Sequence, residues 1–111
     1  MHISSAIIFA AVLTLTGCSS SSVVSITNRS SVTVSNVVLS GSGFTNRFEN
    51  IAPGGERHFT VRPRGESGLR VAFDAAGRTV DSGEQGYFEA DGYHVTAIIG
   101  TNLSVSVSSN L

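Results

Sequence analysis

The sequence predicts an all-β protein, a small antiparallel β-sandwich of seven or eight short strands. Three observations support this fold class. After residue 22 the apolar residues recur with a period of two, turn-forming segments return at roughly 8–12-residue intervals, and no later segment has a helical period. The domain of about 90 residues is close to the lower limit for a self-sufficient core, so two packed layers are expected.

The first two predicted strands differ in how regularly they alternate. Val24 and Ile26 begin the first apolar run, which ends in the turn-rich segment 28–31. The next run, 32–39, changes its apolar phase near the middle. A bulge near Ser35-Asn36, or burial on both faces of the strand, would reconcile the two phases.

Two turns bound the third predicted strand. Glycines in the segment 41–43 turn the chain before it, and Phe44 and Phe48 then point to the same side. The segment 52–55, Ala-Pro-Gly-Gly, follows the strand. Proline at its second position and glycine at its third fit a type II turn.

Alternation is most regular in the second half of the chain. A short edge strand is expected around 78–80 and a brief one at 87–89, and Ile98 beside Ile99 predicts a central strand covered on both sides. The size and strand number favour an immunoglobulin-like sandwich. The residues expected to face the core are Phe59, Val61, Leu69, Val71, Phe73, Tyr93, Val95, Ala97 and Ile99.

The N-terminal segment has the features of an export signal. Residues 6–15, AIIFAAVLTL, form an apolar run of signal-peptide length, shorter than the ~20 residues of a bilayer-spanning helix. The next residues complete Leu15-Thr16-Gly17-Cys18, which resembles the lipobox of bacterial lipoproteins. This resemblance implies a diacylglycerol thioether on the Cys18 sulfur, cleavage before Cys18 and acylation of the new N-terminus.

The resemblance divides the chain into three expected parts. Residues 1–17 are a lipoprotein signal peptide, 18–22 are the lipidated cysteine and a serine tether, and 23–111 are the β-sandwich domain. In Gram-negative lipoproteins the residue after the cysteine directs sorting, and Ser19 implies export to the outer membrane, facing the periplasm. Each buried methylene contributes ~0.8 kcal/mol, so two or more acyl chains give a stable membrane anchor.

Composition argues against several classes of protein. The net charge is −1, and all seven basic residues are arginines spread along the chain. A nucleic-acid-binding surface needs a clustered positive excess, so no nucleic-acid partner is expected. The single cysteine cannot form an internal disulfide. No cofactor is expected beyond the covalent lipid on Cys18, and no small-molecule substrate is evident.

The most unusual surface segment is 62–70, which places three guanidinium groups and a carboxylate beside one loop. It is interpreted either as a solvated hairpin, with Glu66 paired to an arginine, or as a recognition loop on a rigid sandwich. Arginine is favoured at interfaces because its planar fork pairs with carboxylates. The candidate partner-binding residues are Arg62, Arg64, Glu66 and Arg70.

No spacing in the sequence predicts catalysis. After loss of the signal peptide, His58 and His94 are the only imidazoles. Strand histidines that face outward are usually plain surface residues, so neither a metal site nor an enzyme is expected. The leading hypothesis is a lipid-anchored, non-catalytic module that binds another envelope protein or assists envelope assembly. The alternative is an inhibitor or immunity lipoprotein that protects the envelope against a lysozyme or toxin.

Overall fold

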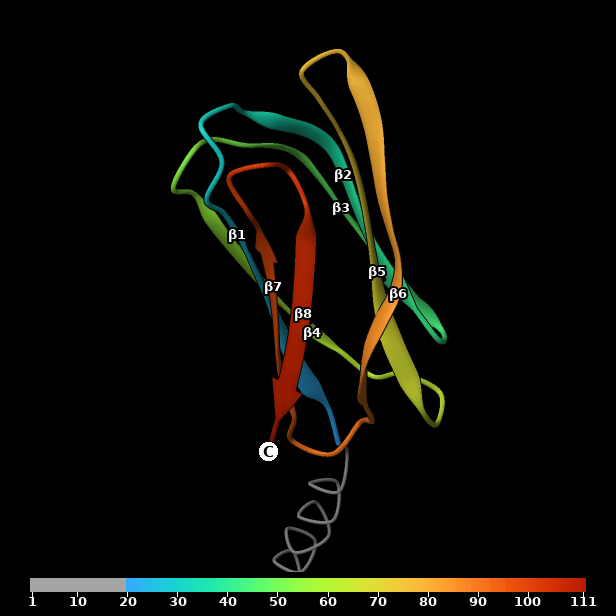
Figure 1. Ribbon diagram of the computed structural model, residues 1–111. Helices are drawn as coiled ribbons and strands as arrows, with labels where there is room; N and C mark the ends of the chain where they lie inside the picture. The colour runs from blue at the N-terminus through green and yellow to red at the C-terminus, as the bar shows by residue number, and fades with distance from the viewer. Residues whose placement is uncertain (1–19) are drawn as a thin grey trace, which may run out of the picture.

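The computed structural model describes residues 20–111, which form eight strands in two four-stranded sheets (Figure 1). The predictions that concern the signal peptide, Cys18 and Ser19 lie outside the described residues. Within residues 20–111, no helix combines the length and apolar character that a membrane span requires. The all-β sandwich prediction is confirmed. The strands are β1 (Ser22–Asn28), β2 (Val34–Gly41), β3 (Phe44–Ile51), β4 (Glu56–Val61), β5 (Ser67–Ala75), β6 (Arg78–Phe88), β7 (His94–Ile99) and β8 (Val105–Asn110).

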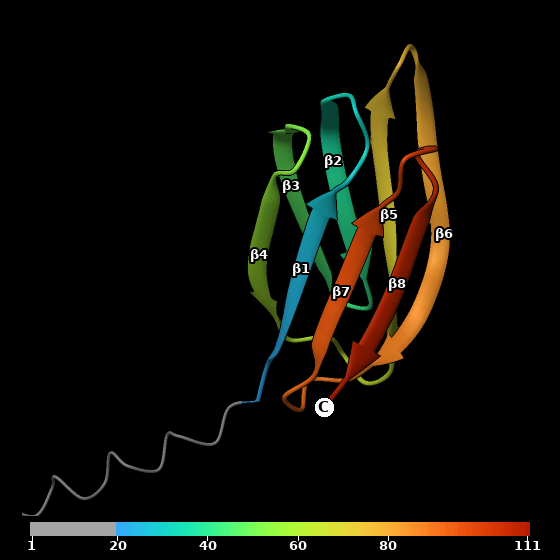
Figure 2. The same cartoon turned by 60° about the vertical axis from the view of Figure 1, so that its left-hand side comes forward.

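The two sheets lie face to face, and Figure 2 shows the sheet that contains β1 in front. Sheet A has the order β4-β1-β7-β8, and sheet B has the order β3-β2-β5-β6. The pair β1 and β7 is parallel, with Val24 opposite Val95, and departs from the antiparallel arrangement that we predicted. The sequence could not predict this pair, because apolar periodicity shows which side of a strand is buried but not which strands are neighbours. In the structure β1 lies inside its sheet, between β4 and β7. The order also differs from that of immunoglobulin constant domains, ABED and CFG.

The core lies between the sheets and contains the apolar residues that alternate inward. Phe44 packs on Phe88 at a centroid distance of 6.0 Å, and Phe48 packs on Phe59 at 5.9 Å, which joins sheet B to sheet A. Full burial of each large apolar side chain contributes about 1.5–3 kcal/mol. The largest fully buried side chains are Phe73, Phe88, Ile26, Leu39, Ile51, Leu69 and Ile99.

Two local predictions in the first half are confirmed. The register between β2 and β5 shifts between Ser35 and Val38, where Asn36 adopts a φ of 50°. Asparagine tolerates this left-handed conformation better than most residues, which suits it to the bulge. In the turn 52–55, Gly54 has a φ of 80° and the amide of Gly55 donates to the carbonyl of Ala52 at 2.8 Å, as a type II turn requires.

Strand β6 is longer than the short edge strand predicted around 78–80. It continues for eleven residues, and Gly83 and Gly86 adopt positive φ angles of 67° and 77°. The strand curves toward β8 (Figure 2). There Gln85 Nε2 donates to the carbonyl of Val105 at 3.1 Å, so side chains of β6 cover part of the open edge of β8.

Strand β7 is interior in sheet A, as predicted, but it is not covered on both sides. Ile98 points outward between Thr27 and Ser106 and is half-buried, because the sandwich has only two layers. Tyr93 is half-buried against the core, as expected for a core aromatic residue.

Four segments meet at the end of the sandwich where β1 begins, the lower end in Figure 1. We call this the N-terminal end, and the other the opposite end. Strand β1 starts at Ser22, so the residue expected to end the tether belongs to the sheet, with 1% of its surface exposed. The segments of the N-terminal end are the turn 42–43, the loop 62–66, the loop 89–93 and Leu111.

Candidate functional site

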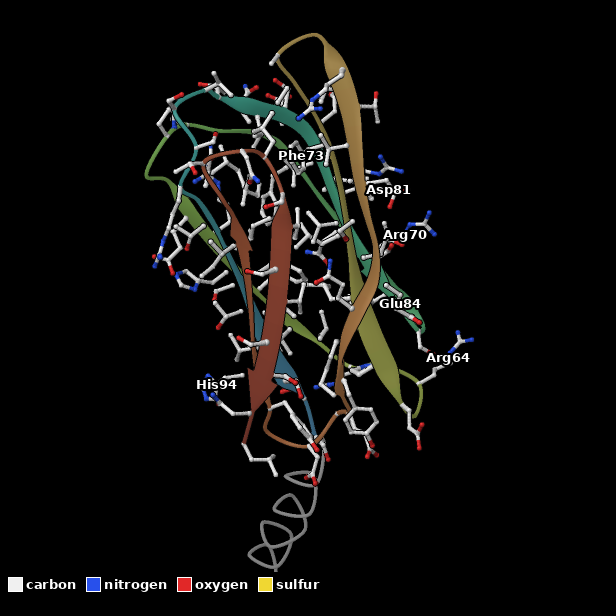
Figure 3. The ribbon with its side chains drawn as sticks, in the orientation of Figure 1. Arg64, Arg70, Phe73, Asp81, Glu84 and His94 are labelled. Atoms are coloured by element: carbon white, nitrogen blue, oxygen red, sulfur yellow. The ribbon has the colours of Figure 1, made fainter. Side chains whose placement is uncertain are left out.

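The structure separates the four candidate partner-binding residues. Arg62, Arg64 and Glu66 lie in the loop between β4 and β5 at the N-terminal end, whereas Arg70 lies within β5 on the outer face of sheet B. Figure 3 shows Arg64 at the loop and Arg70 farther along the sheet, with Glu84 on the neighbouring strand β6. The interpretation of the segment 62–70 as one recognition loop therefore applies only to its first part.

The loop that carries Arg64 is fixed to the neighbouring turn. The amide of Arg64 donates to the carbonyl of Ser42 at 3.0 Å, and the hydroxyl of Ser42 donates back to the Arg64 carbonyl at 3.0 Å. The stem of Arg64 covers Gly43, where a Cβ atom would stand 3.0 Å from Arg64 Cγ. Pro63 is buried between two exposed arginines. The loop thus presents Arg62 and Arg64 from an ordered backbone.

Arg70 forms a two-pronged ion pair across to β6. Its Nε lies 2.9 Å from Asp81 Oδ1, and its Nη2 lies 2.7 Å from Asp81 Oδ2. The hydrogen bond from Arg70 lowers the pKa of Asp81 to about 2, with help from the amide of Gly83. The same hydrogen bond raises the pKa of Arg70. Both side chains are about half exposed, so the pair orders this face more than it stabilises the fold.

Glu66 does not form the predicted pair with an arginine. Among residues 20–111, the arginine that forms an ion pair is Arg70, with Asp81. His58 Nε2 lies 3.6 Å from Glu56 Oε2, a contact that is ionic only when the imidazole is protonated. Glu66 instead lines a small open hollow of about 240 Å³ together with Glu84 and Tyr87. No arginine lines this acidic hollow, and the side chain of Arg64 lies over Gly43 instead.

The outer face of sheet B, which we call the B face, has an apolar centre and charged surroundings. Val38 lies opposite both Arg47 of β3 and Ala72 of β5, and Ala72 lies opposite Asp81 of β6. Val38 and Ala72 are half-buried. An apolar centre with a polar rim is the usual anatomy of a protein-binding surface. The charged residues of the B face are Arg47, Glu49, Arg70, Asp74, Asp81 and Glu84.

Hydrogen bonds fix the position of Asp74 on the B face. Asn36 Nδ2 donates to Asp74 Oδ2 at 2.9 Å, and the hydroxyl of Thr79 donates to Asp74 Oδ1 at 2.9 Å. These two bonds, led by that of Asn36, lower the pKa of Asp74. Because β2, β5 and β6 each contribute one of these side chains, three strands hold the carboxylate in one place.

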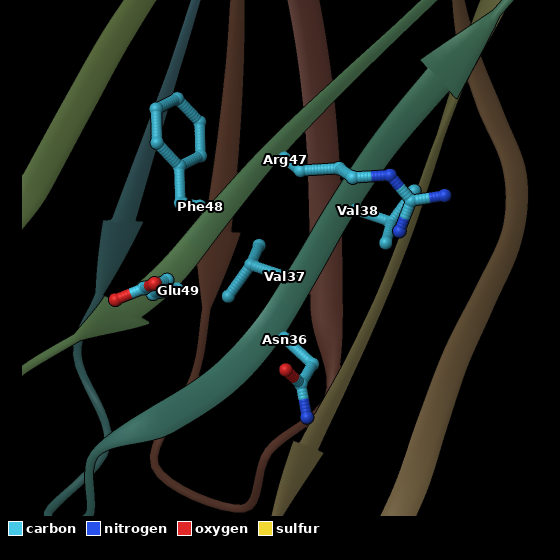
Figure 4. A pocket seen from close by; sticks show the side chains of 6 residues that line it. All are labelled: Asn36, Val37, Val38, Arg47, Phe48 and Glu49. Carbon is cyan, nitrogen blue, oxygen red and sulfur yellow. The ribbon is translucent and has the colours of Figure 1, made fainter.

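The bulge in β2 opens a pocket on the B face (Figure 4). Its volume is about 210 Å³, below the ~300–1,000 Å³ of typical small-molecule sites. This size suits one inserted side chain better than a substrate or cofactor. The lining residues are Asn36, Val37, Val38, Arg47, Phe48 and Glu49.

The outer face of sheet A is different, because hydroxyl groups dominate it. One row across the sheet contains His58, Ser25, Thr96 and Ser108, which are opposite one another in register. His94 is on β7, and β1 lies between it and the strand of His58. Within the described part of the chain, no three histidine, cysteine, aspartate or glutamate residues gather as metal ligands.

Sequence reasoning missed most of the B face. The inward alternation of Phe44 and Phe48 leaves Arg47 on the outer side of its strand, but the sequence does not show that Val38 lies beside Ala72 or Ala72 beside Asp81. Those neighbours follow from the order β3-β2-β5-β6, which pairs strands that are not consecutive in the chain. The one sequence signal was the phase change in the run 32–39, because the pocket forms at that bulge.

Comparisons with known proteins support the fold and nothing further. No family model matches the chain, and no curated protein matches it. A solved structure, the NMR structure of a protein from Eubacterium rectale, is similar with a TM-score of 0.51 over 79% of this chain and 86% of that chain. The sequence identity is 14%, so the likeness shows a shared sandwich architecture alone.

Proposed function

We propose that this protein is a lipid-anchored lipoprotein of the outer membrane, and that its β-sandwich is a non-catalytic module that binds another envelope protein. The observation that carries this proposal is the short distance between the lipobox cysteine and the folded domain. Ser21 is only three residues after Cys18, and its carbonyl already accepts a hydrogen bond from the amide of Gly92 at 2.9 Å. With a lipid on Cys18, a linker this short would keep the domain at the membrane surface.

The B face supports the binding part of the proposal. It offers an apolar centre at Val38 and Ala72, a pocket sized for one side chain, and charged groups held in place by Asn36 and Asp81. Prearranged charges of both signs favour a protein surface with the complementary arrangement. Such a partner gains specificity from the rim and affinity from the apolar centre.

Membrane fractionation tests the anchor. The full chain, expressed with its own N-terminal segment in a Gram-negative host, is expected in the outer-membrane fraction. Cys18→Ser removes the acylated sulfur and should leave the chain unanchored, while Ser19→Asp should retain an acylated chain in the inner membrane. A Cys18→Ser chain that fractionates like the wild type would contradict lipid anchoring.

Site-specific photo-crosslinking tests the binding face. A photoreactive residue replaces Val38 on the B face, and a matched one replaces Thr96 on the outer face of sheet A, where it is also half-buried. A discrete crosslinked partner is expected from position 38 alone, and it should weaken when Arg47→Glu reverses one rim charge. Equal crosslinking from both positions, or none from position 38 in intact cells, would contradict binding through the B face.

A further inference from the structure

The exposed apolar side chains gather at one end of the sandwich. Within residues 20–111, the large hydrophobic residues with high exposure are Val23 at 37%, Val32 at 36%, Tyr87 at 44% and Leu111 at 78%. Three of these four lie at the N-terminal end, because Val23 is the second residue of β1, Tyr87 is near the end of β6 and Leu111 follows β8. Val32 lies in the loop between β1 and β2 at the opposite end. Clustered exposed apolar groups indicate a contact surface.

Both tyrosines of the chain lie at this end, Tyr87 exposed and Tyr93 half-buried. Their rings meet edge to face at a centroid distance of 6.3 Å. The Tyr87 hydroxyl donates to the carboxylate of Glu89, so one edge of the ring is polar while its body is exposed. Tyrosine is enriched at membrane–water interfaces because such a ring suits a boundary between apolar and wet surroundings.

Charges of both signs surround the tyrosines. Arg62 and Arg64 are exposed and form no ion pair within residues 20–111. Glu66, Glu89 and Asp91 lie in the loops of the same end. This mixture does not suit a strongly anionic surface. It suits a layer that carries phosphate and ammonium groups together, as zwitterionic phospholipid headgroups do.

The tether brings this end to such a layer. The three peptide steps from Cys18 to Ser21 span at most about 11 Å. The hydroxyl of Ser22 donates to the carbonyl of Glu89 at 2.5 Å and accepts from the amide of Tyr93 at 3.1 Å, so the chain is tied to the loop 89–93 from its first strand residue. The headgroup region of one leaflet is about 5–8 Å thick, so the tether cannot hold this end far above it.

We propose that the N-terminal end of the sandwich is a lipid-contact surface for zwitterionic headgroups such as phosphatidylethanolamine. Arg62 and Arg64 pair with phosphates, the acidic loop residues face the ammonium groups, and Val23 and Tyr87 enter the interface. This inference rests on the proposed lipid at Cys18. It also assigns the arginine loop to the membrane and leaves the B face for the protein partner.

Fluorescence quenching in vesicles tests the contact, because the chain has no tryptophan and accepts single reporters. Tyr87→Trp places a reporter at the N-terminal end, and Val32→Trp places a matched reporter at an exposed apolar position of the opposite end. The seven residues of β1 alone separate the two ends by about 23 Å. The acylated full-length variants are reconstituted in phosphatidylethanolamine and phosphatidylcholine vesicles with a nitroxide on a fraction of the headgroups.

The expected result is loss of most of the Tyr87→Trp fluorescence and retention of the Val32→Trp fluorescence. Equal quenching of the two reporters, or none of either, in protein that floats with the vesicles would overturn the lipid contact while the anchor stands. Protein that fails to float would overturn the anchor and the contact with it. Val23→Trp provides a second reporter at the N-terminal end if Tyr87→Trp does not fold.

A charge-reversal pair tests the role assigned to the arginines. In the Tyr87→Trp background, Arg62→Glu with Arg64→Glu should weaken quenching, whereas Arg78→Glu, at the hairpin of the opposite end, should leave it unchanged. Quenching that is insensitive to the loop arginines, or equally sensitive to Arg78, would overturn their pairing with phosphate.

Discussion

The two ends of the sandwich are secured in the same way but present different surfaces. Strand β1 has a buried polar residue at each end, Ser22 and Asn28, and each ties the strand to a neighbouring loop. The N-terminal end nevertheless exposes Tyr87 and the arginine loop, while the opposite end closes its first loop with internal hydrogen bonds. The proposed lipid contact accounts for this difference, because it gives the exposed groups of the N-terminal end a role in contact rather than in folding.

The largest effect is expected from removing the buried amide at the opposite end. Asn28 is fully buried, donates to the carbonyls of Val32 at 2.8 Å and Ile51 at 2.9 Å, and accepts from the amide and hydroxyl of Ser30. Asn28→Ala removes the side-chain partner of the Ile51 carbonyl and of the Ser30 amide, while the Ser30 hydroxyl can still donate to the Val32 carbonyl. The variant should lower the free energy of unfolding by about 2–4 kcal/mol. Urea denaturation measures this loss, and a change below about 1 kcal/mol would contradict the importance of the network.

Ser22→Ala should have a smaller effect at the N-terminal end. The variant loses two hydrogen bonds to the loop 89–93 but keeps the backbone bond from the amide of Val23 to the carbonyl of Tyr93. The expected cost is about 1–2 kcal/mol. Hydrogen exchange at the Tyr93 amide should accelerate more than exchange at Ser30. If instead Ser22→Ala costs more than Asn28→Ala, the N-terminal end is the more tightly held one.

The B face, between the two ends, should respond to acid. Because the folded pKa of Asp81 is lowered to about 2, its ion pair contributes stability above the unfolded pKa near 3.8, and that stability is lost as the pH falls toward 2. The melting temperature of the wild type should therefore fall more steeply between pH 4 and 2 than that of Asp81→Asn. Parallel pH profiles for the two proteins would show that the pair does not form in solution.

The smallest effect concerns the tyrosine cluster. The hydrogen bond to Glu89 raises the pKa of Tyr87 to about 12 from 10.0. Its contribution to stability is present below pH 10 and is lost as the pH rises through the folded pKa. Spectrophotometric titration should detect one tyrosine that ionises near 12, and Glu89→Gln should lower that value. An unchanged titration in Glu89→Gln would contradict the contact.

The sequence predicts the local structure well and the neighbourhood of residues poorly. Leu69, Val71 and Phe73 alternate as expected because one face of a strand must meet the core. The turn at Gly54 was predictable because its third position needs a positive φ, which glycine adopts easily. Strand order has no such local signal. Arg70 therefore appeared to belong with Arg64, whereas β6 supplies its partner, Asp81.

The central claim is that a lipid on Cys18 holds this domain at the membrane, and an intact-mass measurement tests it most directly. Protein extracted from outer membranes in detergent should begin at Cys18 and exceed the mass of residues 18–111 by a diacylglyceryl group and an amide-linked acyl chain. The added mass should disappear in Cys18→Ser. A wild-type chain that begins at Met1, or that carries no acyl mass, would contradict the account.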